Sequence, residues 1–164
     1  MSRLFLLLGG NIGNKSAIFK EAKNKLQEKL GKIVKKSSIY ETEPWGFKAK
    51  DNFWNQSLII ETLLSPKEVL KITKETETEL GRIRGEKRYT SRTIDIDILF
   101  YGNLIINEPN LEIPHPRMIN RRFVLVPLSE ITSDMIHPVF KKTIKELLEE
   151  CTDTLEVNKI KDID

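Results

Sequence analysis

Two aspartates separated by a single residue, Asp95 and Asp97, form the clearest candidate for chemistry in this 164-residue sequence. They lie in a run, residues 93–101, in which apolar and polar residues alternate as they do in a β-strand. Side chains on a strand alternate between its faces, so both carboxylates should point the same way, with their Cα atoms roughly 6.5–7 Å apart. Like charges on one face repel, and Mg²⁺ ions, which prefer oxygen ligands, would relieve that repulsion. Taken alone, this spacing more often marks the solvated face of an amphipathic edge strand.

Basic residues flank this run on both sides. Those upstream are Arg82, Arg84, Lys87, Arg88 and Arg92, and those downstream are His115, Arg117, Arg121 and Arg122. Cations around a metal-binding carboxylate pair are typical of a polyphosphate site, where metal ions bridge phosphate oxygens and arginines bind the others. The alternative for the upstream residues is an exposed basic loop that binds RNA. RNA binding alone would not explain two carboxylates directed to one place.

A glycine-rich segment, residues 9–16, offers a second possible phosphate site. Its sequence, GGNIGNKS, nearly matches the phosphate-binding pattern G-x-x-x-x-G-K-[ST]. Asn14 stands where that pattern requires the glycine that lets the backbone wrap the phosphates. We therefore interpret the segment as a tight strand-to-helix turn that could line a ligand pocket, with Lys15 at the surface. A degenerate phosphate-loop kinase is the alternative.

Several aromatic residues lie near one amide and suggest a pocket for a flat ring. The set is Tyr40, Thr42, Pro44, Trp45, Phe53, Trp54, Asn55 and Phe123. A heterocycle could stack between the rings while Asn55 pairs with an amide-like ring edge. The alternative is that the rings belong to the core, and at least one of Phe53 and Trp54 must, because neighbours on a strand face opposite ways. Asn55 is expected on the same face as Phe53.

The elements that would position these residues follow from periodicity and from helix and turn signals. Strands are expected at residues 3–8, 33–42, 53–64, 93–101 and 122–126, and helices at residues 15–30, 65–80 and 143–150. Ser65 and Glu68 should form a capping box at one helix start, with Pro66 at the first helical position, and Gly31 should cap the end of the first helix.

The order of these elements predicts the fold class. Strand, helix, strand, strand, helix, strand is the split βαβ pattern, so we expect an α+β sandwich of ferredoxin-like type, an antiparallel sheet with helices on one face. Residues 104–107 should pair back on the strand at residues 93–101. The side chains that this strand should direct into the core are Ile94, Ile96, Ile98 and Phe100.

The composition excludes several classes of protein. Hydrophobic residues make up 39% of the chain, charged residues 31%, and the net charge is only +3, which favours a folded domain over a disordered chain or a wholly nucleic-acid-binding surface. The single cysteine, Cys151, excludes a disulfide framework and favours the cytoplasm. The apolar run at residues 4–8 is too short for a signal peptide or a membrane span. We expect one catalytic domain over residues 1–157 and a frayed polar tail over residues 158–164.

Several separated motifs resemble those of the 6-hydroxymethyl-7,8-dihydropterin pyrophosphokinase family. They lie at residues 9–13, 40–46, 53–55, 88–99, 114–118 and 120–121, in the family's order. The resemblance implies a ferredoxin-like fold and transfer of the β,γ-diphosphoryl group of ATP to the hydroxymethyl oxygen of the pterin, leaving AMP, to make a folate precursor. It implies ATP and the pterin as partners and two Mg²⁺ ions as cofactor. We expect a monomer with no nucleic-acid or membrane partner.

The same resemblance implies roles for individual residues. Asp95 and Asp97 would hold the metal ions. The residues that would join them in contacting phosphates and stabilising the transferred charge are Arg82, Arg92, His115 and Arg121. Those on the nucleotide side would also include Glu77, Arg84, Ile98 and Leu111, and those around the pterin would be Thr42, Pro44, Trp45, Phe53, Asn55 and Phe123. The sequence departs from the family's usual residues at Gly10, Lys74, Gly85 and Thr90.

Overall fold

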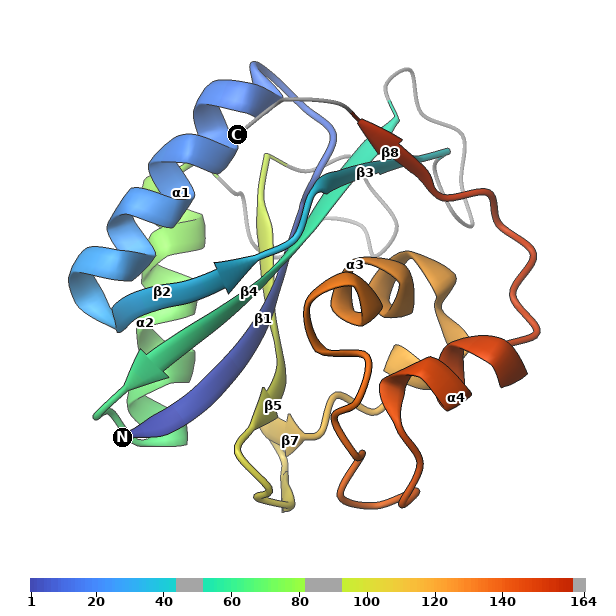
Figure 1. Cartoon of the computed structure of the whole chain (residues 1–164). Helices are drawn as coiled ribbons and strands as arrows, with labels where there is room; N and C mark the ends of the chain where they lie inside the picture. Colours follow the sequence, from blue (N-terminus) through green and yellow to red (C-terminus); the bar gives the residue numbers. More distant parts are fainter. Residues whose placement is uncertain (44–51, 82–92, 161–164) are drawn as a thin grey trace.

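The fold is built on a six-stranded antiparallel sheet, in a computed structural model that describes residues 1–43, 52–81 and 93–160 (Figure 1). The strands of this sheet are β1 (Ser2–Gly10), β2 (Gly31–Lys36), β3 (Ile39–Thr42), β4 (Phe53–Thr62), β5 (Asp95–Tyr101) and β8 (Asn158–Ile160). They lie in the order β5-β1-β4-β3-β8, and β2 pairs with another part of β4. A separate two-stranded sheet consists of β6 (Ile106–Glu108) and β7 (Leu111–Ile113).

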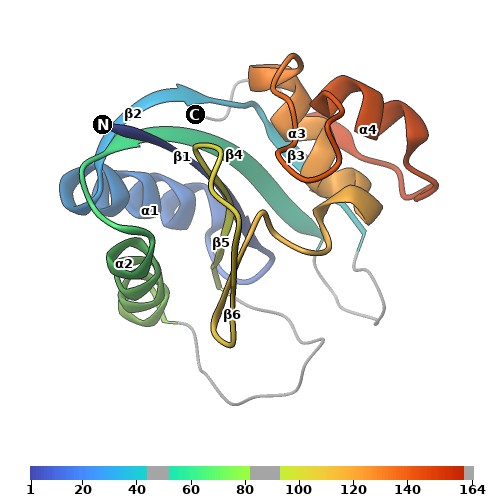
Figure 2. The same cartoon turned by 90° about the horizontal axis from the view of Figure 1, so that it is seen from below.

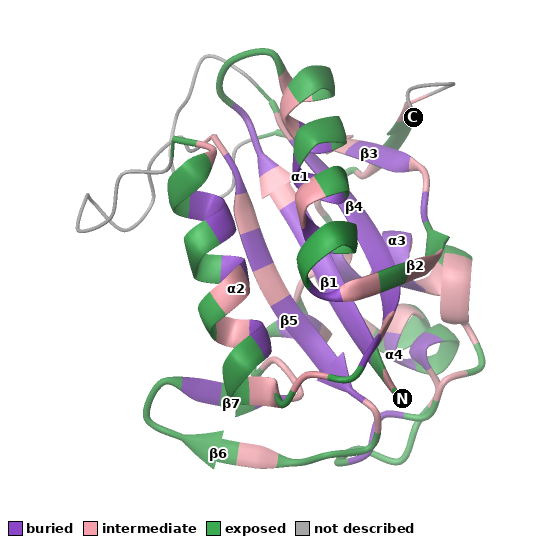
Figure 3. Cartoon of the chain, turned by 90° about the vertical axis from the view of Figure 1, so that its left-hand side faces the viewer, coloured by how far each residue is buried: buried purple, intermediate pink, exposed green. Residues whose placement is uncertain are grey.

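Two pairs of helices cover the two faces of the large sheet. The helices are α1 (Lys15–Lys29), α2 (Pro66–Glu79), α3 (Arg122–Thr132) and α4 (Ile144–Glu150), and a short 3₁₀ helix, η1 (Met118–Asn120), precedes α3. Figures 1 and 2 show α1 and α2 on one side of the sheet and α3 and α4 on the other. Leu4, Leu6 and Leu8 of β1 pack in the core with α1 and α2, whereas Phe5 and Leu7 pack with α3 and α4. The central strands are therefore buried, as Figure 3 shows in purple.

The predicted α+β class, antiparallel sheet and ferredoxin-like element order are confirmed, but helices cover both faces and not one. Residues 122–126, predicted as a strand, instead begin α3. A short apolar run does not by itself distinguish a buried strand from a helix. Pro127 lies inside the helix, and because proline lacks the backbone N–H of a helical hydrogen bond, this residue does not favour a helix in the sequence. In the structure, Val124, Leu125 and Leu128 lie at helical spacing and are buried against the sheet.

Local sequence signals set the starts of the first two helices. The capping box of α2 is confirmed: the Ser65 hydroxyl accepts the Glu68 N–H (3.2 Å), and the Glu68 carboxylate accepts the Ser65 N–H (2.9 Å). Asn14 performs the same function for α1, since its side-chain oxygen accepts the Ala17 N–H at 3.1 Å. These bonds satisfy N–H groups that have no partner within the helix.

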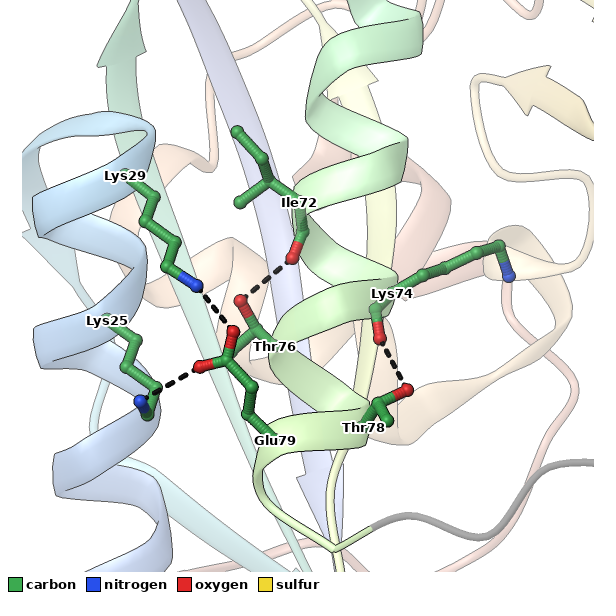
Figure 4. Close-up of polar contacts among 7 residues, drawn as sticks. All are labelled: Lys25, Lys29, Ile72, Lys74, Thr76, Thr78 and Glu79. Atoms are coloured by element: carbon green, nitrogen blue, oxygen red, sulfur yellow. Dashed lines mark hydrogen bonds and ion pairs between the residues drawn. The ribbon is translucent and has the colours of Figure 1, made fainter.

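An exposed ion-pair cluster links α1 to α2. The carboxylate of Glu79, at the end of α2, accepts hydrogen bonds from Lys25 (2.9 Å) and Lys29 (2.6 Å) of α1 (Figure 4).

The close approach of β2 to β4 explains the glycine at position 31, which begins β2 and does not cap α1. Its φ is 145°, and a Cβ there would collide with the carbonyl oxygen of Glu61.

Three further expectations are corrected by strand pairing. Residues 33–42 form two strands, β2 and β3, with Ser37 between them donating its N–H to the carbonyl of Ser57 at 2.9 Å. Residues 104–107 do not pair with β5; β6 pairs with β7 instead. Residues 158–160, expected in a frayed tail, form β8, which pairs with β3.

A β-bulge changes the face of one predicted core residue. Ile94, Ile96 and Ile98 pack beneath α1 and α2 as expected. Leu6 pairs with Ile98 and Phe5 pairs with Phe100, so β5 has one extra residue between them. Phe100 consequently lies on the α3 side of the sheet, in contact with Phe5 at a ring-centroid distance of 5.6 Å.

Across the described residues, the helices are too short or too polar for any of them to cross a membrane.

Candidate functional site

Four strands contribute one residue each to a row across the sheet. Asp95 of β5 pairs with Gly9 of β1, and Gly9 pairs in turn with Asn55 of β4. Asn55 pairs with Tyr40 of β3. Paired residues project from the same face, which here is the α3 face, because the Tyr40 hydroxyl donates to Glu130 of α3 at 2.6 Å. Asp95 and Asn55 are thus two strands apart, roughly 10 Å, with only a glycine between them.

A cavity of about 320 Å³ lies at the outer edge of β5, lined by residues of this strand, of α2 and of the segments 109–112 and 115–116. Six of the predicted nucleotide and metal residues line it: Glu77, Asp95, Asp97, Ile98, Leu111 and His115. Lining residues that were not predicted as site residues include Thr73, Asn110, Glu112 and Pro116. Lys74, noted only as a departure from the family, also lines the cavity, and Figure 4 shows its side chain extending from the side of α2 that faces away from Glu79.

The two aspartates are half-buried and lie on one face of β5, as their spacing predicts. Asp97 pairs with Leu7 and Asp95 with Gly9, so the pair points toward the α3 side of the sheet. Among residues 1–43, 52–81 and 93–160, no group of three or more His, Cys, Asp or Glu side chains forms a metal site. A pair of carboxylates suits Mg²⁺, which commonly binds one or two carboxylates together with water and substrate phosphates.

Glu77 of α2 holds the strand segment between the two aspartates. Its side chain is only 4% exposed, and its Oε2 accepts the backbone N–H of Ile96 at 2.7 Å. Among the described strands, β5 lies at the edge of the sheet, so none of them accepts this outward N–H. Glu77 therefore fixes the backbone that carries Asp95 and Asp97, a role that its position in a helix sequence does not reveal.

His115 is held as a neutral imidazole with a defined orientation. Its backbone N–H donates to the carbonyl of Leu99 (3.0 Å), and its Nδ1 accepts the N–H of Arg117 (3.2 Å). Burial lowers the pKa of His115 to about 4, with the charges of Arg121 and Arg117 acting in the same direction and Asp95 opposing them. Since Nδ1 is an acceptor, the proton lies on Nε2, which can donate to an anionic oxygen.

Arg121 and Phe123 flank the first residue of α3. The guanidinium carbon of Arg121 lies 5.7 Å from the centroid of the Phe123 ring. The positive charge of Arg121 also acts on His115, whose pKa it lowers. The start of α3 thus brings a cation and an aromatic ring to the same part of the molecule as His115.

The predicted pterin residues of the described chain also lie together on the α3 face. Thr42 pairs with Phe53, and Asn55 follows on the same face of β4. Asn55 is only 4% exposed, and its Oδ1 would lie 2.9 Å from a Cβ on Gly9, so the amide occupies the space above that glycine. Trp54 lies on the opposite face, in the core, as expected for one member of the Phe53–Trp54 pair.

The glycine-rich segment has a structural role. Lys15 donates to the carbonyl of Asn52 at 3.1 Å and lies 5.1 Å from the Trp54 ring centroid. β1 pairs antiparallel with both β4 and β5, so this strand is not part of the parallel unit that carries a phosphate-binding loop. The interpretation as a tight turn is favoured over a phosphate-loop kinase. Predicted residues Pro44, Trp45, Arg82, Arg84 and Arg92 lie outside the described residues.

Comparison with known proteins gives a consistent family match. The model of the family described as 7,8-dihydro-6-hydroxymethylpterin-pyrophosphokinase (HPPK) matches residues 5–133. The 2-amino-4-hydroxy-6-hydroxymethyldihydropteridine pyrophosphokinase of Aquifex aeolicus is 40% identical over 152 residues, which cover 93% of this chain and 94% of that protein. The protein of the same name from Bacillus subtilis is 43% identical over 128 residues, 77% of this chain and 76% of that protein.

Other relatives are longer proteins. The folic acid synthesis protein fol1 of Pneumocystis carinii is 39% identical over 150 residues, which cover 92% of this chain but only 20% of that protein. A solved structure of Plasmodium falciparum HPPK-DHPS aligns with a TM-score of 0.73 and 19% identity, covering 91% of this chain and 44% of that one. The chain therefore spans a fifth of the first protein and less than half of the second, and the structural likeness supports the fold alone.

Proposed function

Since this chain belongs to the 7,8-dihydro-6-hydroxymethylpterin-pyrophosphokinase family, we propose that it transfers the β,γ-diphosphoryl group of ATP to the hydroxymethyl oxygen of 6-hydroxymethyl-7,8-dihydropterin. The products would be AMP and the pterin diphosphate, a precursor in folate biosynthesis. The observation that carries the proposal is the convergence of six predicted nucleotide and metal residues on one cavity at the β5 edge.

The row across the sheet supports a placement for the two substrates. The cavity beside Asp95 would take the triphosphate, and the α3 face near Asn55 would take the pterin. Only Gly9 separates these positions, so a small group such as a hydroxymethyl could reach from one to the other. Diphosphoryl transfer depends mainly on bringing the two reacting atoms into line and on neutralising charge, and the short separation of these two positions supports the first requirement.

The polar residues around the cavity would meet the second requirement. Asp95 and Asp97 would hold two Mg²⁺ ions, which, when bound, neutralise phosphate charge and lower the pKa of the attacking hydroxyl. His115 is neutral near pH 7 and would donate its Nε2–H to a phosphate oxygen. Arg121 would add a fixed positive charge beside it. Glu77 would keep both aspartates in place by accepting the backbone N–H of Ile96, which lies between them.

The remaining assignments rest on the resemblance. We propose that Arg82, Arg84 and Arg92 bind the triphosphate, that Ile98 and Leu111 contact the adenine, and that Thr42, Pro44, Trp45, Phe53 and Phe123 surround the pterin. We also propose a cytoplasmic monomer with one catalytic domain that acts on these two small molecules without nucleic acid or membrane.

The direct test is a phosphorus NMR assay with ATP, Mg²⁺ and 6-hydroxymethyl-7,8-dihydropterin. We expect AMP and pterin diphosphate, with AMP appearing only when the pterin is present. Gly102→Ala serves as an active control, because a Cβ at that turn would meet no atom within 4 Å, whereas Asp97→Asn should be inactive. ADP as product would indicate a γ-phosphoryl kinase, and a folded protein without turnover would refute the proposal.

A further inference from the structure

The helix that presents Arg121 and Phe123 has no side-chain cap from its own N-cap residue. Arg121 occupies that position, and its side chain caps no N–H of α3. The acceptor comes from Asp153, 31 residues further along the chain, whose Oδ2 accepts the N–H of Arg122 at 2.9 Å. Its other oxygen, Oδ1, accepts the N–H of Leu155 at 3.0 Å. Asp153 is thus a remote N-cap, and its negative charge is also favourable at a helix N-terminus.

The capped residue lies directly between two residues assigned to the substrates. Arg122 is the first residue of α3, and Arg121 and Phe123 are its neighbours in sequence. The bond from Asp153 to the Arg122 N–H therefore fixes the backbone from which both side chains project. Arg121 and Phe123 contact each other in a cation–π arrangement, so a shift of this backbone would displace both.

A second carboxylate holds the other end of α3. Glu130 accepts the Tyr40 hydroxyl at 2.6 Å, the Ser38 N–H at 3.1 Å and the Ser38 hydroxyl at 3.0 Å, all from β3 or the residue before it. Glu130 is eight residues after Arg122, roughly 12 Å along the helix. With this end attached to the sheet, Asp153 holds the backbone at the other end through the N–H of Arg122.

We infer that Asp153 is a positioning residue that sets the placement of Arg121 and Phe123 toward the substrates. The inference rests on the proposed function for its kinetic consequence, but its structural part does not. Asp153 touches neither the cavity-lining aspartates nor His115 in the described hydrogen bonds, and it acts through the backbone of α3.

The test is Asp153→Ala, measured against Asp153→Asn and Thr143→Ala. We expect Asp153→Ala to raise the KM for the pterin roughly fivefold to tenfold, because Arg121 and Phe123 must then be ordered at the expense of pterin binding, by a free energy similar to that of one helix cap. Asp153→Asn keeps one acceptor oxygen, which can serve the N–H of Arg122 or of Leu155 but not both, so it should recover only part of the affinity lost in Asp153→Ala. Thr143→Ala removes the cap of α4, where the Thr143 hydroxyl accepts the Glu146 N–H at 3.1 Å, and should lower Tm without changing KM.

A double-mutant cycle isolates the single hydrogen bond. Arg122→Pro deletes the donor, and proline is well tolerated at the first position of a helix. The backbone of Arg121, with φ −126° and ψ 107°, is close to the region favoured before proline. The proline Cδ takes the place of the amide hydrogen and displaces the Asp153 carboxylate, so in this background Asp153→Ala should raise KM no further, whereas in an Arg122→Ala background it should have its full effect. Equal effects in both backgrounds would overturn the inference.

Two readouts work whether or not the protein turns over substrate. Hydrogen exchange at the Arg122 amide should accelerate in Asp153→Ala, and the ring NMR signals of Phe123 should shift. Faster exchange with unchanged Phe123 signals and unchanged KM would show that the cap is structural only and overturn the inference. Shifted Phe123 signals in a protein that makes no AMP would instead overturn the proposed function and support the positioning role.

Discussion

Gly9 is the position at which a single methyl group should separate stability from substrate affinity. A Cβ there would lie 2.9 Å from Asn55 Oδ1, closer than real Cβ contacts come, while the next nearest atom, the Trp54 carbonyl oxygen, is 3.8 Å away. The clash in Gly9→Ala is therefore confined to the end of one side chain. Asn55 can relieve it by rotating its amide, so the backbone need not move.

This rotation should lower the free energy of unfolding only slightly but weaken pterin binding strongly. Asn55 is 4% exposed, so its amide has little room, and an off-rotamer side chain costs about 0.5–1.5 kcal/mol. The unfolding free energy of Gly9→Ala should fall by about that amount. If Asn55 hydrogen-bonds to the edge of the pterin ring, the same displacement breaks those bonds, and the KM for the pterin should rise by about tenfold or more. The KM for ATP should not change.

Steady-state kinetics with each substrate varied, together with urea unfolding, would measure both effects. Gly102→Ala is a suitable control, because its φ of 53° disfavours alanine while no atom lies within 4 Å of the added methyl group. It should lower stability and leave both KM values unchanged. An unchanged pterin KM in Gly9→Ala, or an equal rise for ATP, would refute the placement of the pterin beside Asn55.

Three further predictions concern the cavity. Asp95→Ala and Asp97→Ala should each lower kcat by several orders of magnitude with an unchanged circular dichroism spectrum, because charge neutralisation provides most of the catalysis. Glu77→Ala should lower the unfolding free energy by about 1–3 kcal/mol in urea titrations, because it leaves the Ile96 N–H buried without its acceptor. The pKa of His115, about 4 in the folded protein against about 6.5 unfolded, should make stability fall as pH drops from 6.5 toward 4, by up to about 3 kcal/mol. The unfolding free energy of His115→Gln should be flatter over this pH range, and a slope equal to that of the unmodified chain would contradict the assignment.

Elements specified by neighbouring residues could be predicted from the sequence. The start of α2 is one example, because Ser65 and Glu68 bond to each other across one turn. Elements whose position depends on pairing with distant residues could not be predicted in this way. Phe100 changes face because of its register against β1, and α3 is recognisable as a helix only once its apolar residues are seen packed on the sheet.

The candidate site divides in the same way. The alternation of side chains along a strand predicted that Asp95 and Asp97 share a face, and in the structure both residues line one cavity. The resemblance named Glu77, but no sequence pattern indicates that its carboxylate accepts the backbone N–H of Ile96. Asp153 was not identified at all, because its partner lies 31 residues away.

The position of β5 at the edge of the sheet has a consequence for self-association. An edge strand with free N–H groups is a template on which another chain can add a strand. Here the N–H of Ile96 is bonded to Glu77, and two aspartates lie on either side of it. An incoming strand would have to displace one buried carboxylate and approach two others. The residues that we propose to bind phosphates and cations at this edge thus also discourage the chain from aggregating through it.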